Sequence, residues 1–309
     1  MAYSSPIGIA LGGGSARGWA HIGILNWLRE NGIEPHVICG TSIGALVGGI
    51  EAAGETRRLQ DWVLKLEWQD VLSYLDVGLA GGLIRGAKLF EFFRRHFDDR
   101  VIEDLSRSYA AVATELATGQ EIWLREGSLL DAIRASIAVP GLFTPERKTS
   151  AQEWLVDGGL VNPVPVSLCR ALGARRVIAV DLNTDILERF GGYGERDFGT
   201  QVSELSAERR WTANLGAALR ERAQQVRSYL PGGGEGLPSM VDVVTQSVYI
   251  MQVRITRSRL AGDPPDMLLT PRLGHISMME FHRADEAIRE GYRCAQEAAP
   301  VLEELLRRS

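Results

Sequence analysis

The sequence of 309 residues has few cysteines and no excess of positive charge. The three cysteines, Cys39, Cys169 and Cys294, lie far apart, which excludes a disulfide framework and a thiolate zinc site and favours a reducing compartment. The formal net charge of −5 leaves no basic field for nucleic acid, so we expect no such partner. Histidines and carboxylates do not cluster with metal-ligand spacing, so we expect neither a metal nor another cofactor.

The sequence also lacks a long apolar run. The N-terminus has no cationic start and only the short apolar segment Ile7–Leu11, so we expect no signal peptide. The uncharged stretch between Glu34 and Glu51 is rich in glycine and too short to span a bilayer. We therefore expect a cytoplasmic protein whose membrane contact would be peripheral at most, at the inner membrane surface. The sequence carries no signal for an oligomeric state.

Strand-like apolar segments alternate with helical segments along the chain. The predicted strands are Ile7–Leu11, His36–Cys39, Ala110–Ala113, Glu121–Leu124, Trp154–Val156 and Val177–Asp181. The predicted helices cover residues 17–30, 43–53, 88–97, 128–137 and 166–172. Strands that alternate with helices predict an α/β fold, in which a mostly parallel central sheet is covered by helices on both faces.

We expect a single domain over residues 1–309, made of three parts. Residues 7–182 form the core, and residues 186–240 form a mobile insertion or flap between Gly-rich polar stretches. Residues 241–309 form a C-terminal helical part that packs on the core.

The expected insertion contains a helical stretch over residues 203–230. Its apolar residues recur at close to helical spacing, and arginines lie on its other faces; the apolar residues are Trp211, Leu215, Leu219, Val226 and Leu230. Such a helix could lie on a membrane surface, cover the site, or simply pack on its own domain.

The stretch "GTSIG", residues 40–44, places Ser42 between a predicted strand and a predicted helix. This is the arrangement of a nucleophile elbow, in which the serine turns sharply out of the strand. Side chains two residues before and after the serine would collide with neighbouring backbone, which explains Gly40 and Gly44. The alternative is an ordinary strand-to-helix turn with a serine at the helix N-cap.

A second glycine-rich turn, "LGGGSARG" at residues 11–18, also follows a strand and opens a helix. Consecutive glycines let several backbone N–H groups point the same way, as an oxyanion hole requires. We predict that the N–H groups of Gly13, Gly14 and Ser15 are the donors, with Gly12 and Gly18 as support. The alternative is a dinucleotide-binding loop, but the spacing is one residue longer than that fingerprint needs.

A nucleophilic serine needs a base, and two kinds of base are available. His275 and His282 occupy the late position of the histidine in an α/β-hydrolase triad, whereas His21, His36 and His96 are more typical of structural histidines. Asp157, in "LVDGGLVNPVP", is the better candidate, because Gly158 and Gly159 after it let the loop approach another backbone. A carboxylate of ordinary pKa is a weak base, so burial would have to raise that pKa. The alternative is a simple Asp-Gly turn.

Four stretches in this order resemble the patatin-like phospholipase family: "LGGGSARGWAHIGIL", "GTSIG", "RASIAVPGLF" and "LVDGGLVNPVP". The likeness is closest to its compact bacterial members and to the catalytic domain of neuropathy target esterase. It runs from about Ile7 to Leu182, with a weaker similarity in "LLTPRLGHISMMEFHRADEAIREGY". The resemblance implies a three-layer patatin-like fold and no metal or cofactor.

The resemblance also implies a serine acyl hydrolase that cleaves ester bonds of phospholipid or lysophospholipid. Ser42 would be the nucleophile and Asp157 the general base and acid, in a dyad that replaces the triad. Many family members have glycine in place of Ser15, whose N–H can still donate unless the backbone there needs a positive φ. Arg17 matches a basic position of the family, where it would brace the loop or add positive potential near lipid phosphate.

Two other function classes remain open. The first is an esterase with a Ser-His-Asp triad, which mutation of His275 or His282 would identify. The second is a non-enzymatic regulatory protein on the same fold. Intact Ser42, Asp157 and glycine loop argue against the second class, because binding alone does not require all three.

Overall fold

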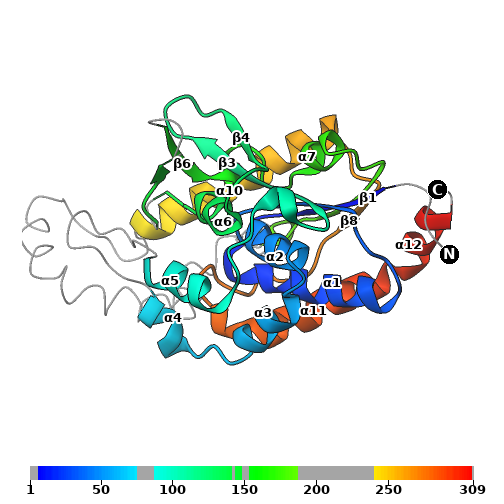
Figure 1. Ribbon diagram of the computed structural model, residues 1–309, viewed down its shortest axis with the longest axis horizontal. Coiled ribbons are helices and arrows are strands. Elements are labelled where there is room, and N and C mark those ends of the chain that lie inside the picture. Colours follow the sequence, from blue (N-terminus) through cyan, green and yellow to red (C-terminus); the bar gives the residue numbers. More distant parts are fainter. Residues whose placement is uncertain (1–5, 75–86, 141–142, 148–152, 187–239, 308–309) are drawn as a thin grey trace, which may run out of the picture. The chain divides into compact units, whose positions relative to one another are not determined.

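The computed structural model describes residues 6–74, 87–140, 143–147, 153–186 and 240–307 (Figure 1). The chain forms two compact units, one of Met1–Ile186 with Ile250–Ser309 and the other of Leu187–Tyr249. The second unit is described only at its last residues, which form the first turns of helix α10 (Met240–Gly262). The helix predicted over residues 203–230 lies outside the described residues. The paragraphs below concern the first unit.

An eight-stranded sheet forms the centre of the first unit. Its strands are β1 (Ile7–Leu11), β2 (Val37–Thr41), β3 (Ser108–Glu115), β4 (Glu121–Leu124), β5 (Glu146–Arg147), β6 (Trp154–Asp157), β7 (Arg176–Val180) and β8 (Met267–Leu269). They pair in the order β5-β6-β3-β2-β1-β7-β8, and β4 also pairs with β3. The pairs β3–β2, β2–β1, β1–β7 and β7–β8 are parallel. The pairs β3–β4, β3–β6 and β5–β6 are antiparallel. The predicted α/β fold with a mostly parallel sheet is therefore confirmed.

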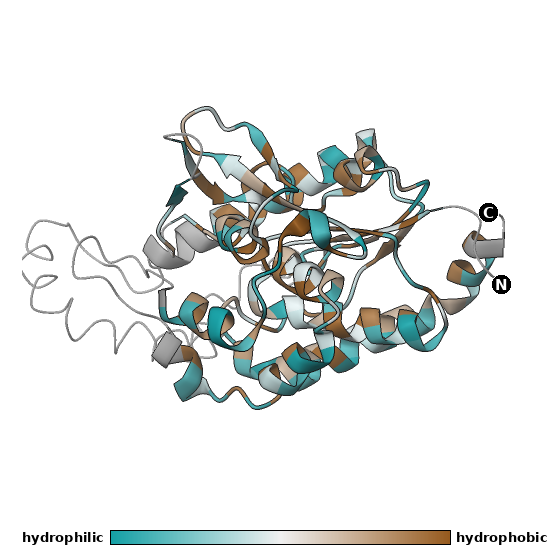
Figure 2. Ribbon diagram, viewed as in Figure 1, coloured by the Kyte–Doolittle hydropathy of each residue, from teal (hydrophilic) through white to brown (hydrophobic). Residues whose placement is uncertain are grey.

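Helices cover both faces of the sheet, with α1, α2 and α11 on one face and α7 and the later turns of α10 on the other (Figure 1). The helices are α1 (Ala20–Glu30), α2 (Ile43–Ala52), α3 (Thr56–Val63), α4 (Trp68–Tyr74), α5 (Ala87–His96), α6 (Leu129–Ser136), α7 (Val166–Ala171), α11 (Ala284–Glu297) and α12 (Ala299–Arg307). A short 3-10 helix, η1 (Ser15–Trp19), precedes α1 and begins the segment predicted as one helix over 17–30. Figure 2 shows hydrophobic residues along the central strands and mixed polarity on the covering helices.

The central strand β1 contributes to a core on each side of the sheet. Ile7, Ile9 and Leu11 pack into the cluster beneath α1, α2 and α11, and Ala10 packs into the cluster with α7. Successive side chains of a strand point to opposite faces, so a strand covered on both faces must be apolar throughout. This is why a short unbroken apolar run predicted the strand correctly.

The C-terminal residues supply both helices and a strand. Helix α11 lies against α1 so closely that a Cβ on Gly23 would come within 1.9 Å of the Ile288 carbonyl oxygen, and one on Gly291 within 2.0 Å of that of Ala20. Strand β8 pairs parallel with β7 at the end of the sheet. The sequence analysis predicted only helices after residue 241, because three residues are too short for a recognisable strand pattern.

Candidate active site

Ser42 forms the turn between β2 and α2. Its backbone has φ 56° and ψ −126°, a conformation that residues other than glycine rarely adopt. A Cβ on Gly40 would lie 2.3 Å from the Gly44 carbonyl oxygen, and one on Gly44 would lie 2.1 Å from that of Leu11. The strand can therefore turn sharply into the helix only with glycine at both positions, which is the geometry of a nucleophile elbow.

The ends of β2 and β6 meet on one edge of β3. Thr41, the last residue of β2, pairs with Val112, and Asp157, the last residue of β6, pairs with the next β3 residue, Ala113. Strand β4 occupies the other edge at both positions, so β6 continues along β3 where β2 stops. The chain leaves both strands at this point, and the register brings Asp157 beside Ser42.

The carbonyl group of Val112 lies against the turn that follows Asp157 and is linked to the turn at Ser42 through Ser136. Ser136, at the end of α6, accepts a hydrogen bond from the Ser42 N–H at 2.9 Å and donates one to the Val112 oxygen at 2.6 Å. A Cβ on Gly158 would lie 2.3 Å from the same oxygen, so a side chain there would push the acid's turn away. The sequence analysis gave Ser136 no role, although it lies in the stretch "RASIAVPGLF".

The carboxylate of Asp157 is buried and incompletely hydrogen-bonded. Only 3% of the residue is exposed; Oδ1 accepts the Gly159 N–H at 2.7 Å, and Oδ2 has no donor among the described residues. Burial raises the pKa of Asp157 from 3.8 to about 6, and the nearby Ser42 hydroxyl and the Gly159 N–H oppose that rise. The two side chains are thus close enough to interact, but they form no hydrogen bond of ordinary geometry; catalytic hydrogen bonds often tighten only with substrate bound.

The glycine loop lies beside Ser42 and keeps two N–H groups without acceptors. A Cβ on Gly13 would lie 3.4 Å from the Cβ of Ser42. The Gly13 N–H itself donates to the Pro163 carbonyl at 3.0 Å, so in this conformation it is not free to serve as the predicted oxyanion donor. The N–H groups of Gly14 and Ser15 have no acceptor in the described part of the chain, and these two predicted donors remain free.

Buried side chains hold the carbonyls of this loop. His21 Nε2 donates to the Gly12 oxygen at 2.8 Å, and Arg17 Nε donates to the Gly14 oxygen at 3.2 Å. Burial lowers the pKa of His21 from 6.5 to about 4, so this histidine is neutral at pH 7. Arg17 is only 2% exposed, which is consistent with the predicted role of bracing the loop.

Two further loop positions show how tightly the turn is built. Ser15 has a φ of 51°, the positive value that favours glycine and that a serine adopts only at some cost. A Cβ on Gly18 would lie 2.2 Å from the side chain of Ile43, the first residue of α2.

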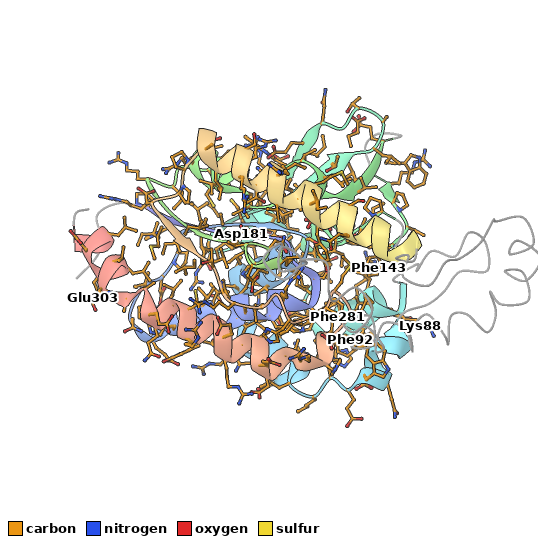
Figure 3. All side chains as sticks on the ribbon, turned by 180° about the vertical axis from the view of Figure 1, so that it is seen from behind. Lys88, Phe92, Phe143, Asp181, Phe281 and Glu303 are labelled. Carbon is orange, nitrogen blue, oxygen red and sulfur yellow. The ribbon has the colours of Figure 1, made fainter. Side chains whose placement is uncertain are left out.

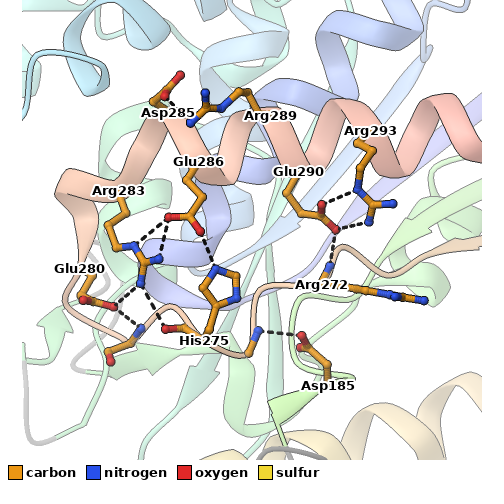
Figure 4. A network of polar contacts seen from close by, with 12 residues as sticks. Asp185, Arg272, His275, Glu280, Arg283, Asp285, Glu286, Arg289, Glu290 and Arg293 are labelled. Carbon is orange, nitrogen blue, oxygen red and sulfur yellow. Dashed lines mark hydrogen bonds and ion pairs between the residues drawn. The ribbon is translucent and has the colours of Figure 1, made fainter. Parts of the chain in front are cut away.

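None of the five histidines, all within the described residues, forms a hydrogen bond with Ser42 or Asp157. His275 Nε2 bonds Glu286 at 2.6 Å in a surface network that also contains Arg283 (Figure 4). The ring of His282 lies edge-on to that of Trp68, with 5.6 Å between the centroids. The imidazole base of the triad alternative is therefore missing from this site.

The family model for patatin-like phospholipases matches residues 9–170, which is more than half of the chain. The chain belongs to the patatin-like phospholipase family. The match contains both glycine turns, the Ser136 region and Asp157, so the site described above lies within the region that defines the family. Membership supports hydrolysis of lipid esters as the class of reaction. An enzyme of this class is a carboxylic ester hydrolase.

The chain is similar to proteins of nearly its own length and to much longer ones. It is 33% identical to an uncharacterized NTE family protein of Mycobacterium tuberculosis, over 97% of this chain and 93% of that protein. It is 29% identical to patatin-like phospholipase domain-containing protein 6 of Homo sapiens, over 93% of this chain but 20% of that protein. The crystal structure of VipD from Legionella pneumophila aligns with a TM-score of 0.46 and 12% identity, over 99% of this chain and 67% of that one.

Two features of the described residues bear on cofactors and membranes. No three histidine, cysteine or carboxylate side chains among them are grouped so that they could hold a metal ion. None of the helices in the described ranges is both long and apolar enough to cross a bilayer.

Proposed function

We propose that this chain is a serine acyl hydrolase that cleaves carboxylic ester bonds of phospholipid or lysophospholipid through a Ser42–Asp157 dyad. The observation that carries the proposal is the buried Asp157 carboxylate with a pKa of about 6 beside a serine in an elbow turn. A base with a pKa near the working pH combines a useful ionised fraction with proton affinity. Structural carboxylates more often have their charge balanced by cations, whereas Asp157 has no cationic hydrogen-bond partner in the described part of the chain.

In the first half-reaction, Ser42 Oγ attacks the ester carbonyl carbon while Asp157 accepts the hydroxyl proton. The carbonyl oxygen becomes an oxyanion, which the N–H groups of Gly14 and Ser15 stabilise. The intermediate then collapses, the bond to the alcohol oxygen breaks, and Asp157 returns the proton to the leaving alcohol. The acyl group remains on Ser42 as an ester.

In the second half-reaction, a water molecule attacks the acyl carbon while Asp157 takes one of its protons. The same N–H groups hold the oxyanion. When the bond to Ser42 Oγ breaks, the proton on Asp157 passes to that oxygen, and the fatty acid leaves. The dyad is restored, and no redox partner or second acid is needed.

Labelling with a fluorophosphonate probe tests the nucleophile. We expect one probe per chain, attached to Ser42 with loss of fluoride, and no label on a Ser42→Ala variant. Ser128→Ala is a matched control, because this serine caps α6 at a position outside the site and its loss affects only stability. Equal labelling of Ser42→Ala would contradict the proposal.

Fatty acid release then tests the substrate class. We expect release from lysophosphatidylcholine or phosphatidylcholine vesicles by the wild type and none by Ser42→Ala. A wild type that takes the probe but hydrolyses only short water-soluble esters would show that the dyad is right and the lipid substrate is wrong.

A further inference from the structure

Asn183, three residues after β7 ends, uses both ends of its side-chain amide on the glycine loop. Its Nδ2 donates to the Gly13 carbonyl oxygen at 3.2 Å, and its Oδ1 accepts from Arg17 Nη2 at 3.1 Å. The residue is 1% exposed. A guanidinium has donors only, so the amide oxygen must face Arg17 and the NH₂ group must face Gly13. The orientation of this amide is therefore determined by its partners.

These contacts determine where the two free N–H groups of the loop point. In a trans peptide the carbonyl and the next N–H lie in one plane and point in opposite directions. The Gly13 carbonyl shares its peptide with the Gly14 N–H, and the Gly14 carbonyl shares its peptide with the Ser15 N–H. Asn183 holds the first carbonyl directly and the second through Arg17, which donates to the Gly14 oxygen. Each free N–H is thus directed away from the pair Asn183–Arg17.

Asn183 is itself held by its surroundings. Its N–H donates to Asp181 Oδ1 at 2.9 Å, and Asp181 Oδ2 accepts the Thr184 hydroxyl at 2.8 Å. Asp181 lies in the interior of the unit (Figure 3), where burial raises the pKa of its carboxyl and the Arg17 charge is among the effects that lower it. The second hydrogen of the Asn183 NH₂ group faces Gln252 Oε1 at 3.5 Å. A residue fixed at its backbone N–H and at both ends of its side-chain amide can hold a loop in one orientation.

We propose that Asn183 is a positioning residue for ester hydrolysis, because it holds the Gly13 carbonyl and the Arg17 guanidinium so that the Gly14 and Ser15 N–H groups face the reacting carbonyl. This proposal rests on the proposed function. Nothing about Asn183 brings it into contact with the substrate; it acts through the loop. Loss of its donor should impair the stabilisation of the oxyanion and leave binding of the acyl chain unchanged.

Asn183→Asp is the sharpest variant, because it keeps the acceptor for Arg17 and replaces the donor to Gly13 with a carboxylate that repels the carbonyl. We expect kcat for an oxyester to fall about 10- to 100-fold, with KM changed less than twofold. Sulfur is a weak hydrogen-bond acceptor, so the rate ratio of an oxyester to its thionoester should also fall, at least severalfold. Asn183→Ala should change both quantities in the same direction and serves if the charged variant does not fold.

Thr56→Val is the matched control for lost stability. Thr56 is equally buried and donates to Glu51 away from the site. We expect its kcat and its oxyester-to-thionoester ratio to stay within twofold of the wild type. A wild-type ratio in both Asn183 variants, or a loss of kcat that Thr56→Val reproduces at equal thermal stability, would overturn the proposal. Complete labelling of Ser42 in all variants after long reaction separates these outcomes from failure of the proposed nucleophile, because a wild type that takes no label at Ser42 would overturn both proposals.

Discussion

Asp157 and Glu286 are two carboxylates with opposite surroundings. Asp157 is 3% exposed, has one backbone donor, and burial raises its pKa to about 6. The Glu286 side chain is 40% exposed and accepts hydrogen bonds from His275 and Arg283 (Figure 4). Its slight burial acts to raise its pKa, but these donors outweigh it and lower the pKa.

The difference distinguishes a carboxylate whose surroundings contribute to stability from one whose surroundings oppose its ionisation. Glu286 is more easily ionised in the folded chain than in the unfolded one, so its partners stabilise the fold above its pKa and that contribution is lost in acid. Asp157 is harder to ionise in the folded chain, so its charge costs stability at neutral pH. Groups that are perturbed in this second way are typical of catalytic sites.

Replacing Asp157 with asparagine should give the largest effect. The change keeps the shape and the acceptor for the Gly159 N–H but removes the base, so ester hydrolysis should fall about 1000-fold or more. The measurement is the initial rate of fatty acid release. Glu286→Gln is the matched control, because it makes the same change from carboxylate to amide at the exposed residue of this comparison. Its rate should equal that of the wild type. Full activity of Asp157→Asn would exclude the dyad.

The pH dependence of the wild type should follow the ionisation of Asp157. Only the ionised carboxylate can accept the Ser42 proton, so kcat/KM should be constant above about pH 7 and fall about tenfold per unit below the pKa of about 6. The measurement is kcat/KM for a soluble ester between pH 4.5 and 8.5. A flat profile over this range would assign the base to another group.

Asp157→Asn should also stabilise the chain at neutral pH. Between pH 3.8 and about 6 the folded chain binds a proton at Asp157 that the unfolded chain has released, so the free energy of unfolding falls as pH rises through this window. A difference of about two pKa units corresponds to at most about 3 kcal/mol above pH 7.

Denaturant unfolding of both variants measures this effect. The free energy of unfolding of Asp157→Asn should exceed that of the wild type at pH 7.5 and equal it near pH 4. Glu286→Gln should show the opposite sign, with a loss below about 1 kcal/mol at pH 7.5, because its partners are exposed. If Asp157→Asn is less stable than the wild type at pH 7.5, its carboxylate is better satisfied than the structure indicates.

Removing His275 should give the smallest effect. His275→Ala deletes one exposed contact to Glu286, so the free energy of unfolding should fall by less than about 1 kcal/mol. Ester hydrolysis should remain within twofold of the wild type. An inactive His275→Ala variant that is still folded would replace the dyad with a triad and make the surface network part of the site.

The sequence predicted those features whose signal is local. Residues 7–11 and 37–39 form unbroken apolar runs because both faces of the sheet are covered, and the runs indicated strands β1 and β2. Ser42 and Asp157 were selected because glycines flank each of them, and the close approaches at Gly40, Gly44 and Gly158 show why a side chain would not fit. Steric demands of this kind can be read from the sequence because they require glycine at neighbouring positions.

Features that depend on distant partners could not be predicted in this way. The Pro163 carbonyl, which occupies the Gly13 N–H, and the amide of Asn183 reach the loop from far along the chain. Single polar residues without a motif, such as Ser136 and Asn183, look the same in sequence whether they are buried in a network or exposed to solvent. The positive φ of Ser15 was raised as a possibility from the sequence, and only the fold decides it.

Strand β3 sets the spacing between the turn at Ser42 and the carboxylate of Asp157. Because Thr41 and Asp157 take adjacent places along it, their separation is set by the spacing of one strand and is independent of the length of chain between them. Loops in that interval can therefore grow or shrink during evolution without disturbing the distance from hydroxyl to acid. Inserting a residue within β3 itself would instead shift one group past the other, so this strand should tolerate changes in length least of all.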